Sequence, residues 1–179
     1  MSQALSVDEV DEESLTTSKY LTFVLGSETY GLDIQYVREI IGILPITPLP
    51  DVPVWIKGVI NLRGKVIPIM DVRARFMLEE RPYGGRTCII VVNVEEWWIG
   101  LVVDTVSEVL DIPHEQIEPP PRVAGRSNDH FIQGLGKVDD HVRLLLDAQR
   151  LVGSDEVSSA NRTANELDES SNHQDRGNE

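Results

Sequence analysis

The residue best placed to bind another molecule is Arg63, which stands at a predicted tight turn within the 19-residue block from Trp55 to Arg73. Between Lys57 and Arg75 the chain holds five Lys or Arg against one Asp, a local charge of +4 in a chain of net charge −14. A guanidinium presents its donors in a planar fork, which suits bidentate capture of a carboxylate or contact with backbone carbonyls. A basic turn on an acidic protein therefore predicts a contact with a partner molecule.

The other residues of this turn have backbone reasons to be there. Gly64 tolerates the positive φ that a hairpin turn needs, and Asn61 is typical of turns because its side chain bonds to nearby backbone groups. Arg63 has no such reason. Its guanidinium could be solvated, could pair with an acid such as Glu39, or could reach a partner, and the sequence leaves these three possibilities open.

Motifs that would mark an enzyme are missing from the sequence. It has no Gly-rich phosphate loop followed by Lys-Ser or Lys-Thr and no Gly-x-Ser-x-Gly elbow. Cys88 lies in an apolar segment, which predicts a core thiol, and the four histidines have no metal-ligand spacing. We therefore expect no catalytic residue, no metal site and no cofactor. The competing hypothesis is a small β-barrel enzyme or ligand-binding protein, which would need a deep pocket with convergent titratable groups.

Two further pairs of residues have structural explanations. Asp71 and Asp147 follow apolar segments at matching places, and we expect them to cap turns rather than to act as an acid and a base. For Trp97 and Trp98, strand alternation predicts that one indole packs into the barrel while its neighbour shields a hairpin. The alternative is an aromatic anchor for a partner.

Most of the negative charge lies at the two ends of the chain. Residues 1–18 carry five acids and no basic residue, and residues 154–179 carry seven acids and two arginines. Such polar segments bury too little apolar area to offset the entropy of ordering. We therefore expect disordered acidic segments over 1–18 and 153–179 and one folded region over 19–152. The acidic balance also argues against a nucleic-acid-binding protein.

The sequence predicts a cytoplasmic protein. The first residues lack the charged-then-apolar pattern of a secretion signal. The apolar run at residues 88–92 is far shorter than the ~18 residues of a membrane span, so we expect no direct membrane insertion. One cysteine cannot form an internal disulfide, in keeping with a reducing compartment.

β-Strand patterns dominate the middle of the chain. Residues 20–25 and 29–34 each show the alternation of a strand and flank a short turn, and so do residues 87–94 and 98–103. Each pair of segments therefore predicts a β-hairpin. After each second strand the apolar spacing changes to about 3.6, which predicts a short helical stretch.

The same order of features occurs twice. Segment 31–40 matches segment 100–109 at a shift of 69 residues, and segment 66–71 matches 142–147. This pattern predicts a duplicated module in which each copy supplies about five strands, enough to close a small antiparallel barrel. Chance similarity among strands rich in Val and Ile is the alternative.

We place the two barrels at about 30–83 and 86–152, with a joint at 83–86. The first strand, 20–26, is expected to join the second barrel. Because each copy is too small to be stable alone, we expect a shared apolar interface between them.

Five segments of the sequence resemble the CheW family of bacterial chemotaxis coupling proteins. They are Tyr30-Gly31-Leu32-Asp33-Ile34, Val37-x-Glu39-Ile40, Ile56-Lys57-Gly58-Val59-Ile60-Asn61-Leu62-Arg63-Gly64, Val66-Ile67-Pro68-x-x-Asp71-Val72-Arg73 and Gly100-Leu101-Val102-Val103-Asp104. The resemblance covers about residues 19–152. It implies a mostly β fold of two intertwined five-stranded SH3-like β-barrels with short helices.

The resemblance also implies a function. Family members are non-enzymatic adaptors without a cofactor. They bridge the cytoplasmic tips of chemoreceptors, the methyl-accepting chemotaxis proteins, to the regulatory domain of the histidine kinase CheA, in the cytoplasm at receptor arrays on the inner membrane. Matching positions imply a receptor-binding set of Val37, Glu39, Gly58, Asn61 and Arg63, in which the acid can pair with the arginine. A scaffold of a non-flagellar chemosensory pathway is the alternative.

Overall fold

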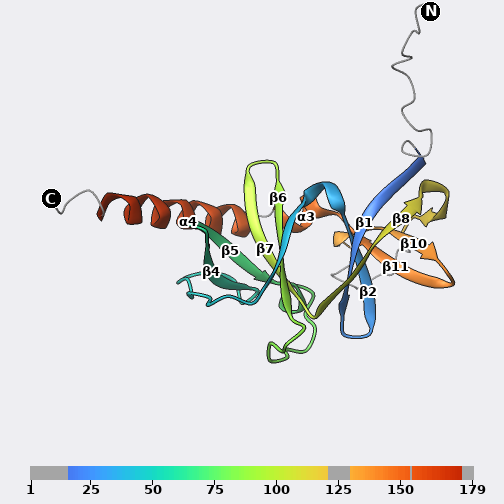
Figure 1. Ribbon diagram of the computed structural model, residues 1–179, viewed down its shortest axis with the longest axis horizontal. Helices are drawn as coiled ribbons and strands as arrows, with labels where there is room; N and C mark the ends of the chain where they lie inside the picture. Colours follow the sequence, from blue (N-terminus) through green and yellow to red (C-terminus); the bar gives the residue numbers. More distant parts are fainter. Residues whose placement is uncertain (1–15, 121–129, 154, 175–179) are drawn as a thin grey trace, which may run out of the picture.

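Two β-sheets lie side by side in the molecule, one of six and one of five strands (Figure 1). The computed structural model describes residues 16–120, 130–153 and 155–174. In chain order the elements are β1 (Thr17–Leu25), β2 (Glu28–Asp33), η1 (Ile34–Tyr36), β3 (Val37–Gly42), β4 (Ile56–Leu62), β5 (Lys65–Asp71), α2 (Val72–Arg75), β6 (Cys88–Val94), β7 (Trp97–Val103), β8 (Thr105–Pro113), η2 (His114–Gln116), β9 (Ile117–Glu118), β10 (Ile132–Val138), β11 (His141–Leu146), α3 (Ala148–Val152) and α4 (Asp155–Gln174).

The two sheets are intertwined because each takes a hairpin from the other half of the sequence. The six-stranded order is β8-β1-β2-β11-β10-β9, and the five-stranded order is β3-β6-β7-β5-β4. Both predicted hairpins, β1–β2 and β6–β7, form as antiparallel pairs. The predicted mostly β fold of two intertwined SH3-like units is therefore confirmed.

The predicted boundaries of the two barrels are wrong. The chain passes between the sheets at η1 and at Asp104, so the five-stranded sheet uses residues 37–103. The expected joint at 83–86 lies between α2 and β6. Because α2 follows β5, and β5 and β6 belong to the same sheet, this segment connects two strands of one sheet and does not separate two barrels. The cause is the parallel pairing of β5 with β7, which keeps the β6–β7 hairpin beside β4–β5.

The stretches that follow the two hairpins also differ from expectation. After β2 a short helical turn forms, η1, as predicted. After β7 the chain bends at Asp104 and continues as the long strand β8, which pairs with β1. Residues 105–113 therefore form a strand by pairing with β1, although their apolar spacing near 3.6 predicted a short helical stretch.

The two halves use matched glycines to make their parallel strand pairs. Gly31 of β2 lies opposite Leu145 of β11, and Gly100 of β7 lies opposite Ile69 of β5. A Cβ atom would come within 2.8 Å of the Leu145 side chain at position 31 and within 2.6 Å of the Ile69 side chain at position 100. The repeated Gly in the sequence therefore marks the same steric need in both halves.

Asp71 and Asp147 also have the same role in both halves. Asp71 is the last residue of β5 and Asp147 directly follows β11, and each is the N-cap of the short helix that comes next. An Asp71 carboxylate oxygen accepts the Ala74 N–H at 3.3 Å, and an Asp147 oxygen accepts the Arg150 N–H at 3.1 Å. Their prediction as capping groups is confirmed.

Strand β6 shows how the core is shared. Ile89 and Val91 pack inside the five-stranded sheet, whereas Ile90 and Val92 face a larger cluster that includes buried residues of both sheets. This alternation follows from the two-residue period of a strand. Because the central strands are buried on both faces, neither sheet is an independent unit, and the predicted apolar interface is confirmed.

A strap of chain after β3 covers the free edge of β4. Thr47 and Val59 exchange two backbone hydrogen bonds of 2.8 Å. Beside them Gly58 has a φ of +141°, and a Cβ there would lie 2.0 Å from the Thr47 carbonyl oxygen. Only glycine fits beneath this crossing.

The expectation of a disordered acidic tail over 153–179 is wrong for residues 155–174, which form α4. The buried residues of α4 are Val157, Ala160, Asn161 and Ala164, spaced as one helical face. The amino-acid composition predicted disorder because these small side chains give the segment little apolar character. They nevertheless pack closely against a sheet. Residues 175–179 lie outside the described residues. So do residues 1–15 of the predicted N-terminal segment, whereas Thr17 and Ser18 belong to β1 and pair with β8.

A half-hidden ion pair fastens the crossing between the sheets. The Arg73 guanidinium donates two hydrogen bonds, of 2.6 and 2.5 Å, to the Asp104 carboxylate. The same carboxylate accepts the Gly26 N–H from the β1–β2 turn at 2.9 Å. The Arg73 side chain is only 8% exposed. The pair thus joins α2, the β7–β8 bend and the first hairpin.

Breaking this ion pair should destabilise the protein in a pH-dependent way. The hydrogen bond from Arg73 lowers the pKa of Asp104, so the stability it contributes is present above the ordinary Asp pKa and is lost as the pH falls through the lowered value. Asp104→Asn should reduce the unfolding free energy at pH 7 by about 3 kcal/mol. The difference from wild type should shrink towards pH 3. Urea denaturation at both pH values measures it.

The control for this experiment is Asp111→Asn, which breaks the exposed pair of Asp111 with Lys19. That change should cost less than about 1 kcal/mol. Equal losses in the two variants, or a loss in Asp104→Asn that is the same at both pH values, would contradict the prediction.

Gly58→Ala should destabilise the protein by at least about 3 kcal/mol, because the new methyl group collides with the strap and φ is unfavourable. Gly42→Ala is the matched control, since a Cβ at position 42 meets nothing within 4 Å. Urea denaturation of both variants tests this, and similar midpoints would show that the strap yields.

Candidate functional site

The turn that carries Arg63 has a backbone that an arginine does not favour. Leu62 pairs with Lys65, which leaves Arg63 and Gly64 as a two-residue loop. Their φ values are +51° and +86°, the left-handed pattern of a type I′ turn. Asn and Gly are the usual residues there, and a left-handed arginine costs roughly 1 kcal/mol. The nearby Asn61 carboxamide accepts the Gly64 N–H at 2.9 Å, as its prediction as a turn residue requires.

Arg63 pairs with Glu39 across the two outermost strands of the five-stranded sheet. The guanidinium donates a hydrogen bond to a carboxylate oxygen of Glu39, which lies in β3. This confirms one of the three possibilities left open by the sequence. The Arg63 side chain is nevertheless 70% exposed and that of Glu39 30%. The pair therefore forms an accessible charged corner rather than a buried bridge.

The other predicted site residues lie around this corner in different ways. Asn61 is exposed and shares the turn with Arg63. Val37 begins β3 and is half-buried against the shared core. Gly58 is buried beneath the strap and can act only through the backbone. The structure thus brings Glu39 and Arg63 into direct contact, and the receptor-binding role of all five stays a prediction.

The equivalent turn of the other sheet has the opposite charge. Val138 pairs with His141, so Asp139 and Asp140 form the two-residue loop between β10 and β11. Both residues have positive φ values, +50° and +62°. The two turns share a backbone geometry, but one presents an arginine and the other two carboxylates.

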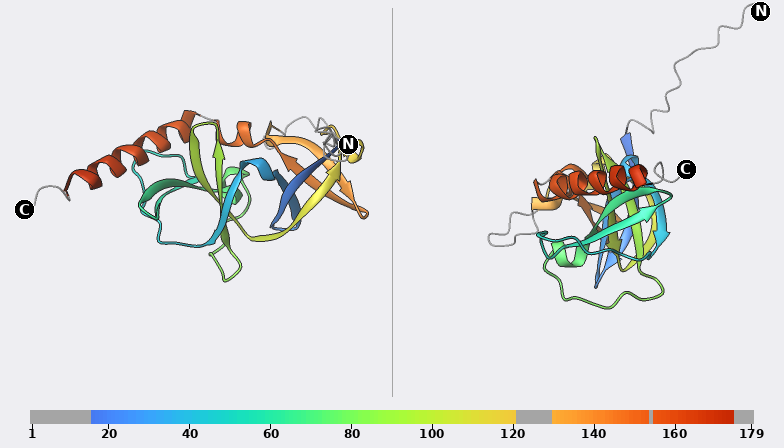
Figure 2. Two further views of the ribbon diagram at one scale, coloured as in Figure 1. Left: turned by 45° about the horizontal axis from the view of Figure 1, so that its top comes forward. Right: turned by 90° about the vertical axis from the view of Figure 1, so that its left-hand side faces the viewer.

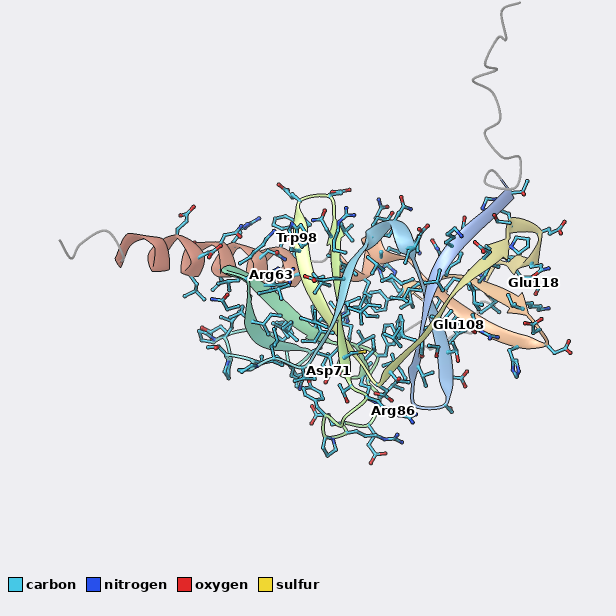
Figure 3. All side chains as sticks on the ribbon, in the orientation of Figure 1. Arg63, Asp71, Arg86, Trp98, Glu108 and Glu118 are labelled. Atoms are coloured by element: carbon cyan, nitrogen blue, oxygen red, sulfur yellow. The ribbon has the colours of Figure 1, made fainter. Side chains whose placement is uncertain are left out.

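Lys65, the residue after the basic turn, is held by an aromatic ring. Its ammonium lies 3.6 Å from the centre of the Trp98 indole. Burial lowers the pKa of Lys65, and the Asp168 carboxylate on α4 opposes that shift. Figure 3 shows Arg63 and Trp98 in the half of the molecule along which α4 runs.

The neighbouring tryptophans are both half-buried against the protein. Trp97 contacts the shared core, and Trp98 contacts the interior of the five-stranded sheet. Alternation along β7 therefore places the two indoles on opposite faces, as predicted, but both pack against apolar clusters, whereas one was expected to shield a hairpin.

Sequence reasoning missed the contribution of α4 to this region. Asn161 and Asp168 come from the segment that was expected to be disordered. The signal was the spacing of Val157, Ala160 and Ala164 at helical intervals, which the acidic composition outweighed.

A polar cavity of about 450 Å³ lies on another part of the surface, lined by Lys57, Asp71, Glu80, Arg81, Pro82 and Tyr83. The Tyr83 hydroxyl donates to an Asp71 oxygen at 2.9 Å. Burial and this hydrogen bond raise the pKa of Tyr83. Lys57 pairs with Glu80 at 3.1 Å. These bonds hold the 79–83 segment against α2 and β4. The polar groups that form them therefore have a structural role.

Cys88 is half-buried, and burial raises the pKa of its thiol, which disfavours the reactive thiolate.

Among residues 16–120, 130–153 and 155–174 no three His, Cys, Asp or Glu side chains are placed to hold a metal ion. No helix in this part of the chain is long and apolar enough to cross a membrane.

Comparisons with known proteins agree with the fold of this chain. A family model described as the CheW-like domain matches residues 19–156. The chemotaxis protein CheW of Klebsiella aerogenes is 38% identical over 82% of this chain and 88% of its own length. That of Treponema pallidum is 31% identical over 76% and 83%. The crystal structure of the scaffolding protein TtCheW from Thermoanaerobacter tengcongensis superposes with a TM-score of 0.71 at 37% identity, covering 78% of this chain and 94% of that one. The chain therefore belongs to the CheW-like domain family.

Proposed function

We propose that the corner formed by Arg63 and Glu39 is where this protein holds the cytoplasmic tip of a chemoreceptor. As a member of the CheW-like family, the chain is a chemotaxis adaptor that couples chemoreceptors to the histidine kinase CheA. The observation that carries the finer proposal is the strained backbone of Arg63. An arginine that turn geometry disfavours, and that is largely exposed, is best explained by what its side chain contacts.

The corner offers two kinds of recognition. Glu39 fixes one edge of the guanidinium, which leaves the exposed remainder oriented towards a carboxylate, an amide oxygen or a helix C-terminus of the partner. Half-buried Val37 adds apolar contact on the same strand as Glu39. Charged groups at such a rim favour one docking orientation over others.

The adaptor role follows from holding two partners at once. If the receptor tip occupies the Arg63 corner while the regulatory domain of the kinase occupies a different surface, each contact raises the effective concentration of the other. A difference in affinity between two receptor states then becomes a bias on the kinase. We propose that no catalytic step is involved and that the protein acts in the cytoplasm at receptor arrays.

Arg63→Asn should separate stability from binding. Asparagine is favoured in a type I′ turn, so the unfolding free energy should stay within about 1 kcal/mol of wild type even though an exposed ion pair is lost. The Kd for a receptor tip fragment should rise about tenfold or more, as expected for a central arginine contact. Calorimetric titration and urea denaturation of the same variant measure both quantities.

Arg38→Asn is the matched control, because Arg38 is an exposed arginine that precedes Glu39 on the same strand. Its Kd should stay near wild type. Receptor binding by Arg63→Asn at wild-type affinity would contradict the proposal. In the double variant Arg63→Glu with Glu39→Arg, partial recovery of binding relative to Arg63→Glu alone would show that the ion pair itself orients the contact.

A further inference from the structure

The first part of β5, the strand that leads away from the Arg63 turn, pairs with β4 but has no strand pairing on its other side. β5 pairs in parallel with β7 only through Ile69–Asp71 and Gly100–Val102. The first part of β5, residues 65–68, continues beyond that pairing towards the turn. Residues 65–68 therefore need support on this side from an element other than β7.

Helix α4 occupies the place of the missing strand contact. It packs against β5, β7 and β4, along one flank of the five-stranded sheet (Figure 2). Val157, Ala160 and Ala164 on its inner face are at most 1% exposed. Small side chains at these positions let the helix approach the strands closely.

One buried polar side chain completes the hydrogen bonding in this gap. The Trp98 N–H of β7 donates to the Asn161 side-chain oxygen at 3.2 Å. The Asn161 side-chain N–H in turn donates to the Val157 carbonyl at 3.0 Å. Asn161 is only 5% exposed. It therefore supplies, from a helix, an acceptor of the kind that a neighbouring strand would provide.

The contact extends to the residue beside the turn. The Lys65 ammonium lies over the ring of Trp98, whose backbone N–H is the group bound by Asn161. Asp168, one turn beyond Ala164 on α4, is close enough to Lys65 to act on its charge. A connected set of contacts thus runs from α4 through Trp98 and Lys65 to Gly64 and Arg63.

We propose that α4 positions Arg63 by holding the β4–β5 hairpin, so that the guanidinium stays at the Glu39 corner. Asn161, Ala164 and Trp98 are then positioning residues for receptor binding, an inference that rests on the proposed function of that corner. A strained turn relaxes when its strands are free to move, and a recognition group must be held to within about half an ångström to be effective.

The test uses two full-length variants that differ by one position. Ala164→Glu places a carboxylate on the buried face of α4, and Asn165→Glu places the same group on its exposed face. Hydrogen exchange of the Lys65, Val66 and Ile67 amides is compared with that of β10, in the other sheet. Calorimetric titration gives the Kd for a receptor tip fragment.

Ala164→Glu should accelerate exchange of the three hairpin amides by about tenfold or more and leave β10 unchanged. It should also raise the receptor Kd about fivefold or more, while Asn165→Glu changes neither. Asn161→Ala, which removes one hydrogen bond without adding a charge, should act in the same direction more weakly.

Unchanged hairpin exchange in Ala164→Glu would overturn the proposal. Equal acceleration in β10 would overturn it as well, because α4 would then support the whole fold and not the hairpin. Faster hairpin exchange combined with wild-type receptor binding by Arg63→Asn would keep α4 as the support of the hairpin and would reject the Arg63 corner as the receptor site. The two proposals therefore fail separately.

Discussion

The ion pair between Arg73 and Asp104 sits where the chain leaves one sheet for the other, and the arrangement of both sheets depends on that point. Neither half can close alone, because each needs a hairpin that the other half supplies. The pair also reaches the β1–β2 turn through Gly26, so three segments far apart in sequence meet at one carboxylate. A charge so nearly enclosed is stable only with its partner in place. The crossing of the chain between the sheets therefore also brings Arg73 to its carboxylate partner, and the Arg63 corner lies on the five-stranded sheet.

Much of the fold could be predicted from the sequence because local rules decided it. Alternation and short polar turns gave both hairpins, and the repeated Gly31 and Gly100 marked the parallel contacts. The division into two barrels could not be predicted in this way. A strand that is buried on both faces reads as a continuous apolar run, which carries no information about which strands lie beside it. The neighbour of the β6–β7 hairpin is set by pairing between distant segments, so the predicted joint at 83–86 was wrong.

In the candidate site, too, local features could be predicted from the sequence, whereas features set by tertiary packing could not. Residue types alone placed Arg63 at a turn and named Glu39 as a possible partner, and the structure joins them. The left-handed backbone at Arg63 has no sequence signal, since arginine is not selected for that conformation. The packing of α4 was missed because a stripe of alanines is a weak hydrophobic signal within an acidic segment. Its importance appears only when Asn161 is seen to satisfy the Trp98 N–H that β5 leaves open.

The opposite charges of the two matching turns have a consequence for the geometry of assembly. Two turns of the same backbone geometry and the same charge would offer one partner two equivalent sites. The turn at Asp139 and Asp140 has the backbone of the turn at Arg63 and Gly64 but repels what the arginine attracts. The duplicated fold is therefore directional. A partner that recognises charge therefore distinguishes the Arg63 turn from the turn at Asp139 and Asp140.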